Sequence, residues 1–177
     1  MSYQPYSKSL GVTMVELMVA IAIVGILTAI ALPNFASSLK SNRLANTGNE
    51  FIATVAFSRS EAMRNNRGAV FCASSDDSSC GGNWEDGWIV WADANADGIR
   101  QTSGVGEEPV LRRQGPLSKL VTTGGSTTIR FSPRGGVIAG TGSIVLRSDD
   151  CTTGQPFQRQ LDVLAGGMAR IQKQNCP

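Results

Sequence analysis

The sequence has 177 residues, enough for about one domain with a single modest core. Its 16 lysine and arginine residues nearly balance 14 acids, so the net charge by itself indicates no particular partner. Histidine is absent, which removes the commonest general base and the commonest metal-binding side chain. These features disfavour an enzyme, and we expect neither catalytic residues nor a cofactor nor a metal.

An apolar run from Val12 to Leu32 follows a short polar segment. As a helix rising about 1.5 Å per residue it would extend roughly 30 Å, which is the thickness of the hydrocarbon core of a bilayer. Its one charged residue is Glu16, and an acid inside a membrane helix is costly enough to indicate a function. The alternative is a secretory signal peptide cut near Ala29-Ile30-Ala31, although such signals are shorter and avoid acids.

A helical pattern resumes after Pro33, which we expect to kink the helix rather than end it. Apolar residues recur seven, four and seven residues apart, at Leu44, Phe51, Val55 and Ala62. The pattern ends near Asn65 and Asn66. A single helix of roughly 50 residues would therefore cross a membrane with its first half and pack on a sheet with its second.

After Gly68 the pattern becomes that of short strands separated by Gly, Pro, Asp and Ser. Six runs have this character: Ala69–Phe71, Trp88–Trp91, Thr128–Phe131, Ser143–Leu146, Leu161–Val163 and Ala169–Ile171. We expect an antiparallel meander, and one long helix followed by consecutive strands predicts an α+β fold. The three tryptophans, Trp84, Trp88 and Trp91, are expected in its core rather than in a recognition patch.

The four cysteines are Cys72, Cys80, Cys151 and Cys176, and none has the C-x-x-C spacing of zinc or thioredoxin-like sites. Two disulfides in an oxidising compartment explain them best. Three connectivities are open, and we prefer the pairs nearest in sequence, Cys72–Cys80 and Cys151–Cys176.

Two acidic patterns raise the question of a metal or catalytic site. Residues 93–98 (DANADG) match the first half of a calcium loop, but position 12 of that loop would be Gly104 instead of a glutamate. An Asx-rich turn between strands is the simpler interpretation. The acids Glu85, Asp86, Asp93 and Asp97 could form a glycosidase-like pair, yet nothing in their spacing distinguishes them from solvated loop acids.

The N-terminal residues resemble the class III signal of type IV pilins and pseudopilins. Gly11 is followed by Val12-Thr13-Met14-Val15-Glu16-Leu17, an unbroken apolar stretch and Pro33. The resemblance implies that a prepilin peptidase cuts after Gly11 and N-methylates Val12. Glu16 would then pair with the N-terminal amine of a neighbouring subunit, and Thr13 and Pro33 occupy the positions that the family pattern gives them.

Later motifs are similar to those of FimT/FimU-type minor pilins and the related type II secretion pseudopilin H. They are Phe51–Cys72, Gly87–Gly98, Phe131–Gly135 and a closing strand pair that ends at Cys176. The resemblance implies the type IV pilin fold, with a long N-terminal helix packed on an antiparallel sheet. It also implies a leader peptide (residues 1–11), a transmembrane and assembly helix (residues 12–35) and a periplasmic head (residues 36–177).

The function implied is that of a minor pilin that helps prime pilus assembly at or near the tip, for twitching motility, adhesion or DNA uptake. The implied partners are other minor pilins, the major pilin, the prepilin peptidase and the inner-membrane assembly platform. Before assembly the chain would cross the bacterial inner membrane once, with its head in the periplasm, and afterwards it would lie in the surface pilus. A minor pseudopilin of a type II secretion system is the alternative.

A DNA-binding receptor for transformation is a further alternative. Some FimT-type pilins bind DNA through a Gly-Arg-x-Arg motif, and the corresponding Gly167-Met168-Ala169-Arg170 keeps the glycine and the second arginine. Independently, strand alternation predicts outward-facing arginines among the nine bases that follow residue 111. Together they could contact phosphates without sequence specificity: Arg130, Arg134, Arg147, Arg170 and Lys173. The same arginines could instead form a solvated face or a contact with another pilin.

Overall fold

The computed structural model describes residues 11–177, without the side chains of Pro33 and Asn34. The expected leader therefore lies outside the described residues, apart from Gly11. Helix α1 (Met14–Asn65) has 52 residues and continues through Pro33, as the sequence predicts. Contacts along the chain separate two compact units, with the division between Leu39 and Lys40.

The part of α1 in the first unit exposes its large apolar side chains. Met14 is 78% exposed and Phe35 is 64% exposed, and those between them are exposed to a similar degree. The helix is long and apolar enough to cross a membrane. Such a surface is stable only against lipid or against other apolar helices.

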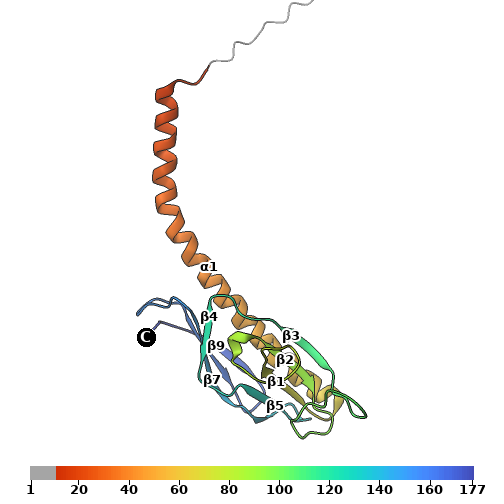
Figure 1. Cartoon of the computed structure of the whole chain (residues 1–177). Coiled ribbons are helices and arrows are strands. Elements are labelled where there is room, and N and C mark those ends of the chain that lie inside the picture. Colours follow the sequence, from red (N-terminus) through yellow and green to blue (C-terminus); the bar gives the residue numbers. More distant parts are fainter. Residues whose placement is uncertain (1–10) are drawn as a thin grey trace, which may run out of the picture. The chain divides into compact units, whose positions relative to one another are not determined.

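The second unit, residues 40–177, is an α+β head in which the C-terminal half of α1 packs against the strands (Figure 1). The first sheet has the order β3-β2-β1-β5-β6. Its strands are β1 (Ala69–Ala73), β2 (Trp88–Ala92), β3 (Val110–Gln114), β5 (Thr128–Phe131) and β6 (Val137–Ala139). The second sheet has the order β4-β7-β8-β9. Its strands are β4 (Leu120–Thr123), β7 (Gly142–Ser148), β8 (Gln158–Val163) and β9 (Ala169–Gln174). All strand pairs are antiparallel.

The expected α+β architecture, a long helix packed on antiparallel strands, is confirmed, and all six predicted runs lie in strands. The prediction of one consecutive meander is wrong. Strand β1 pairs with both β2 and β5, and β4 pairs with β7, so the strands divide between two sheets. The sequence pattern did not reveal β3, β4 or β6. These edge strands carry few buried apolar residues, so their sequences lack the alternation of a half-buried strand.

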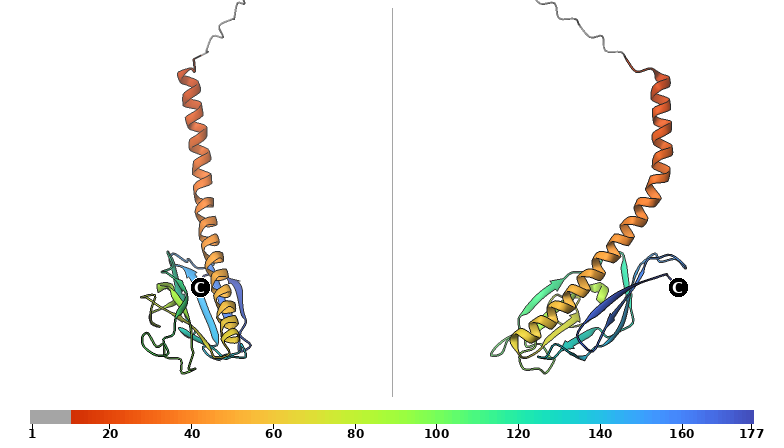
Figure 2. Two further views of the ribbon diagram at one scale, coloured as in Figure 1. Left: turned by 90° about the vertical axis from the view of Figure 1, so that its right-hand side faces the viewer. Right: turned by 180° about the vertical axis from the view of Figure 1, so that it is seen from behind.

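One hydrophobic core joins α1 to the inner faces of both sheets. The predicted helix positions Leu44, Phe51, Val55 and Ala62 are all buried, which confirms the helical spacing. The ring of Phe51 is centred 4.9 Å from Phe71 of β1, and it also packs on Trp84 and Trp88. In Figure 2, seen from behind, the yellow end of α1 crosses the head between green and blue strands. The core lies wholly within residues 40–177.

The outer face of the first sheet is also covered. Val70, Cys72, Ile89 and Trp91 form a second buried cluster on the side of the sheet opposite α1. Both central strands are therefore buried on both faces, which explains their continuous apolar sequences, AVFCA and WIVWA. The three tryptophans are buried, as predicted.

Candidate functional site

The first turn of α1 is built by Thr13. Its Oγ1 accepts a hydrogen bond from the backbone N–H of Glu16 at 3.2 Å, and its carbonyl accepts one from Leu17 at 3.1 Å. Thr-x-x-Glu is the spacing of a helix capping box, and an acid in the first turn is favoured by the helix dipole. Thr13 therefore sets where the helix begins and places Glu16 in its first turn.

Two observations bear on how this segment could be used. A Cβ added at Gly11 would meet no atom within 4 Å, so packing within the described chain does not require glycine there. Among the described residues, the carboxylate of Glu16 has no hydrogen-bond or ion-pair partner. Contacts within the described chain therefore explain neither the glycine at position 11 nor the carboxylate of Glu16.

Two disulfides tie down the loops of the head. Cys72 of β1 is bonded to Cys80 in the loop that follows, with 5.5 Å between the Cα atoms. Cys151 is bonded to Cys176, which fastens the C-terminal residues to the connection between β7 and β8. These are the pairs preferred from the sequence spacing.

The DANADG segment is closed by an arginine. The Nη2 of Arg130 lies 3.2 Å from the buried carboxylate of Asp93 and donates to the carbonyl of Ala96 at 2.9 Å. Asp97 accepts from the backbone N–H of Ile99 at 2.7 Å, as in an Asx turn. The guanidinium of Arg130 thus neutralises the buried acid of this loop. Within the described residues, no cluster of three or more His, Cys, Asp or Glu side chains could hold a metal.

Glu108 organises the same loop from inside. Its side chain is fully buried and accepts from the backbone N–H groups of Ala94 at 2.6 Å and Gln101 at 3.0 Å. The N–H of Glu108 in turn donates to the carbonyl of Gln101 at 2.8 Å. The sequence did not indicate this role, because Glu108 and Ala94 are 14 residues apart and belong to no motif.

The five candidate DNA-binding residues do not form one free basic surface. The guanidinium of Arg130 was expected to be exposed, but the 93–98 loop covers it and Asp93 neutralises it. Arg170 is exposed, yet its Nε lies 2.8 Å from the carboxylate of Asp162. Lys173 pairs in register with the buried Arg159, so it points to the face of the second sheet opposite Arg170. Arg147 of β7 is half-buried, and Arg134 lies exposed in the turn between β5 and β6.

Asp162 is held as an anion by its neighbours. Its carboxylate accepts from Ser143 Oγ at 2.6 Å, from Gln160 Nε2 at 2.7 Å and from Arg170. These hydrogen bonds, that of Ser143 foremost, lower the pKa of Asp162 to about 2. The sequence did not single out Asp162, because its partners come together only when β7, β8 and β9 pair.

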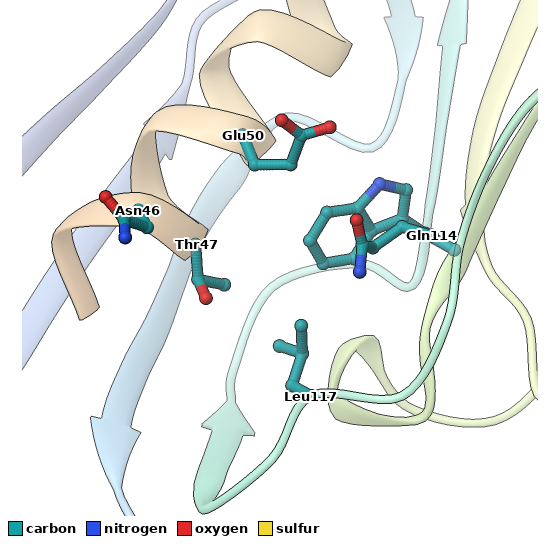
Figure 3. Close-up of a pocket in the computed structure, with 6 residues that line it drawn as sticks. Asn46, Thr47, Glu50, Gln114 and Leu117 are labelled. Carbon is teal, nitrogen blue, oxygen red and sulfur yellow. The ribbon is translucent and has the colours of Figure 1, made fainter. Parts of the chain in front are cut away.

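A pocket of about 260 Å³ opens between α1 and the first sheet. Thr47 and Glu50 of α1 face Gln114 and Leu117 across it (Figure 3). Glu50 is its one acid, and Arg112 Nη2 lies 2.7 Å from the Glu50 carboxylate. The pocket can form hydrogen bonds with a small polar group, but it offers no pair of acids for general acid–base catalysis.

Comparisons with known proteins agree with this architecture. The family model described as Type II transport protein GspH matches residues 47–167, and the prokaryotic N-terminal methylation motif matches residues 6–32. No curated protein sequence matches the chain significantly. Two crystal structures of the type IV minor pilin FimU from Pseudomonas aeruginosa strain PAO1 resemble the chain, each with 18% identity. The first covers 77% of this chain and 94% of the FimU chain with a TM-score of 0.51. The second covers 75% and 96% with a TM-score of 0.48.

The FimU likeness concerns the fold, whereas the GspH match spans more than half of the chain and lies C-terminal to the methylation motif. The chain therefore belongs to the GspH family and is a pilin-like structural subunit, of the kind that includes the FimT and FimU minor pilins.

Proposed function

We propose that this protein is a minor type IV pilin that is processed at its N-terminus and helps to prime pilus assembly, lying at or near the tip. Cleavage after Gly11 would remove the leader and expose Val12 for N-methylation. Residues 12–35 would form the membrane and assembly helix, and residues 36–177 the periplasmic head.

The observation that carries this proposal is the combination of an exposed apolar helix with a carboxylate in its first turn. The large apolar side chains from Val12 to Leu32, and that of Phe35, are exposed, and the carboxylate of Glu16 has no partner among the described residues. A soluble domain would not tolerate such a surface, and a simple anchor would not keep the acid. Both features are explained if the helix first lies in the bilayer and then packs among like helices.

The mechanism is therefore one of packing. When the helix leaves the bilayer, its apolar surface is transferred from lipid to neighbouring helices of other minor pilins or of the major pilin. The carboxylate of Glu16 pairs with the positive N-terminus of an adjacent subunit, which avoids an isolated charge in an apolar bundle. The prepilin peptidase and an inner-membrane assembly platform are the partners that this route requires.

The side chains of the head support a structural role over catalysis. The acids considered for a catalytic pair are engaged in structural contacts: Asp93 pairs with Arg130, and Glu85 accepts from Thr122. Glu50 at the pocket is paired with Arg112. Histidine is absent from the sequence.

A second candidate is a minor pseudopilin of a type II secretion system, which the match to the Type II transport protein GspH family favours. Deleting the gene separates the two. Loss of surface pili with normal protein secretion supports the pilus role, and loss of secretion with normal pili supports the secretion role.

We do not extend the proposal to DNA binding, because Arg130 and Arg170 are paired with acids and Lys173 lies on another face.

Replacement of Glu16 tests the central proposal. Glu16→Ala should leave membrane insertion and leader cleavage largely intact. It should reduce recovery in sheared fibres on the order of tenfold or more, because a loss of about 1.4 kcal/mol in the free energy of packing into the fibre lowers the equilibrium constant by a factor of ten. The isosteric Glu16→Gln should lose recovery in fibres to the same degree. Val15→Ala, which shortens a neighbouring side chain without changing charge, should be recovered as well as the wild type. Normal incorporation of Glu16→Ala would refute the proposed pairing.

A further inference from the structure

We infer that a groove at the end of α1 docks a carboxylate of a neighbouring subunit, flanked by an apolar side chain, with Arg59 as its counter-charge. This inference rests on the proposed role in assembly. The groove, of about 380 Å³, lies between α1 and the turn that joins β8 to β9. Besides Arg59 and Gly167, its walls are formed by Ile52, Val55, Ala56, Met63, Met168 and Ala169. We call it the Arg59 groove.

Two glycine turns lie next to the Arg59 side chain. A Cβ added at Gly135 would lie 2.9 Å from Arg59 Nε and 2.8 Å from Met63 Sδ. One added at Gly167 would lie 3.1 Å from Arg59 Cδ. Both glycines have positive φ, of 79° and 76°, which other residues adopt at a cost. The arginine stem therefore passes close to both turns, and a side chain at either glycine would collide with it.

Arg59 has no acid of its own among the described residues. The closest acid along the helix, Glu61, is engaged by Arg64 at 2.6 Å. The Nε of Arg59 is buried and has no hydrogen-bond partner, and no ion pair involves its guanidinium. A buried Nε–H without an acceptor is unfavourable, and a carboxylate accepting from this guanidinium would remove that penalty. No described residue supplies that acceptor.

The surroundings of Arg59 indicate a protein as the source of that acceptor. Met63 is 45% exposed and Met168 is 58% exposed, at the two sides of the groove. Methionine and arginine are enriched in the cores of protein interfaces, and methionine adapts to varied partner shapes. Non-specific DNA binding instead relies on several solvated cations along a backbone, and the groove contains one cation between apolar walls. On a partner subunit, an acid would pair with the Arg59 guanidinium, and an adjacent apolar side chain would pack on the methionines of the groove.

Two matched probes test the chemistry of the groove directly. N-acetyl-L-leucine carries a carboxylate beside an apolar side chain, and N-acetyl-L-leucinamide is its neutral counterpart. The full chain in detergent micelles, labelled with ¹³C in its five methionine methyl groups, gives the readout. We expect the carboxylate to shift the Met63 and Met168 signals saturably with at least about fivefold higher affinity than the amide, while Met14 and Met18 of the apolar helix do not distinguish the two.

Variants then assign the preference to Arg59. Arg59→Met, which keeps an apolar stem between the glycine turns, should abolish the carboxylate preference, and Arg59→Lys should retain part of it. Arg64→Gln removes the same charge from an exposed site on the same helix and should bind as the wild type does. Equal affinity for the two probes, no saturable shift at millimolar concentrations, or a preference that survives Arg59→Met would each overturn the inference. A DNA duplex that shifts both methyl signals more strongly than N-acetyl-L-leucine would assign the groove to nucleic acid and also overturn it.

An assembly experiment connects the groove to its role. Arg59→Glu should be processed and inserted normally but should be recovered in fibres at least about fivefold less than Arg64→Glu, its matched charge reversal. Equal recovery of these variants refutes docking in the fibre. If the wild-type chain itself never enters fibres, the proposed function is refuted. Probe binding by the isolated chain does not depend on that result, so the two failures can be told apart.

Discussion

The Nε of Arg170 lies 2.8 Å from the carboxylate of Asp162 on the neighbouring strand, at one end of a polar network on the outer face of the second sheet. The network continues from Asp162 through Gln160 and Gln174 to Gln158. Strand pairing brings these side chains together, since Asp162 is opposite Arg170 and Gln158 is opposite Gln174. The contact makes Arg170 part of the architecture of the head.

The network predicts an acid-sensitive contribution to stability. The pKa of Asp162 is lowered to about 2 in the folded head, against about 3.9 for an ordinary aspartate, mainly by the hydrogen bond from Ser143. A group with a depressed pKa stabilises the fold above its unfolded pKa. This stabilisation should therefore be complete above about pH 4 and be lost as the pH falls toward 2.

Thermal unfolding between pH 6 and pH 2 measures this effect. Asp162→Asn should be less stable than the wild type at pH 6, and the difference should shrink as the pH approaches 2. Asp149→Asn, at an exposed acid without a side-chain partner among the described residues, is the control and should follow the wild type. A constant difference between Asp162→Asn and the wild type across the range would contradict the prediction.

The buried carboxylate of Glu108 should be essential to the loop of residues 93–108. Glu108→Ala leaves the backbone N–H groups of Ala94 and Gln101 without an acceptor. At about 1–3 kcal/mol for each buried unsatisfied group, the free energy of unfolding should fall by about 3 kcal/mol or the loop should open locally. Urea denaturation measures the first effect and limited proteolysis the second. Glu107→Ala, at the exposed neighbour, should change the free energy by less than about 0.5 kcal/mol.

The two disulfides should contribute unequally. The Cys151–Cys176 bridge spans 25 residues and the Cys72–Cys80 bridge spans 8. In the loop-entropy model the longer closure is worth about 3.5 kcal/mol and the shorter about 2.5 kcal/mol. Paired Cys→Ser replacements, compared by urea denaturation, should therefore destabilise the head more at the Cys151–Cys176 pair. The reverse order would show that contacts around Cys72 outweigh loop length.

Processing at Gly11 should depend on the glycine and tolerate a change at the next residue. Replacing Gly11 with a larger residue such as Val should block cleavage, because the residue has no packing role in the described chain that would explain its choice. The intact mass of the protein from membranes should then retain the leader. Val12→Phe keeps an apolar residue after the cleavage site and should be cleaved normally. A mature mass unchanged by Gly11→Val would contradict the assignment.

The sequence by itself determined the long helix and the identity of the family. The unbroken apolar run, the Thr13–Glu16 capping spacing and the core positions Leu44 and Phe51 depend on residues within a few turns of one another. Local patterns of this kind report helix position and burial directly, because a helix satisfies its hydrogen bonds within its own segment. The six predicted strands follow from the same local logic.

Only the tertiary structure decided how the strands divide into two sheets and which charged groups are free. Strand β1 pairs with β5 although β5 begins 59 residues further along the chain, at Thr128 instead of Ala69. This pairing depends on which apolar faces meet in three dimensions. Asp93 and Asp162 likewise neutralise arginines that the alternation of the strands had placed outward. The Nε of Arg59 lacks a partner, which could be recognised only after folding brought the turns at Gly135 and Gly167 next to it. The partners of charged side chains come from distant parts of the chain and are set by folding, whereas the periodicity of a helix or strand is present in the local sequence.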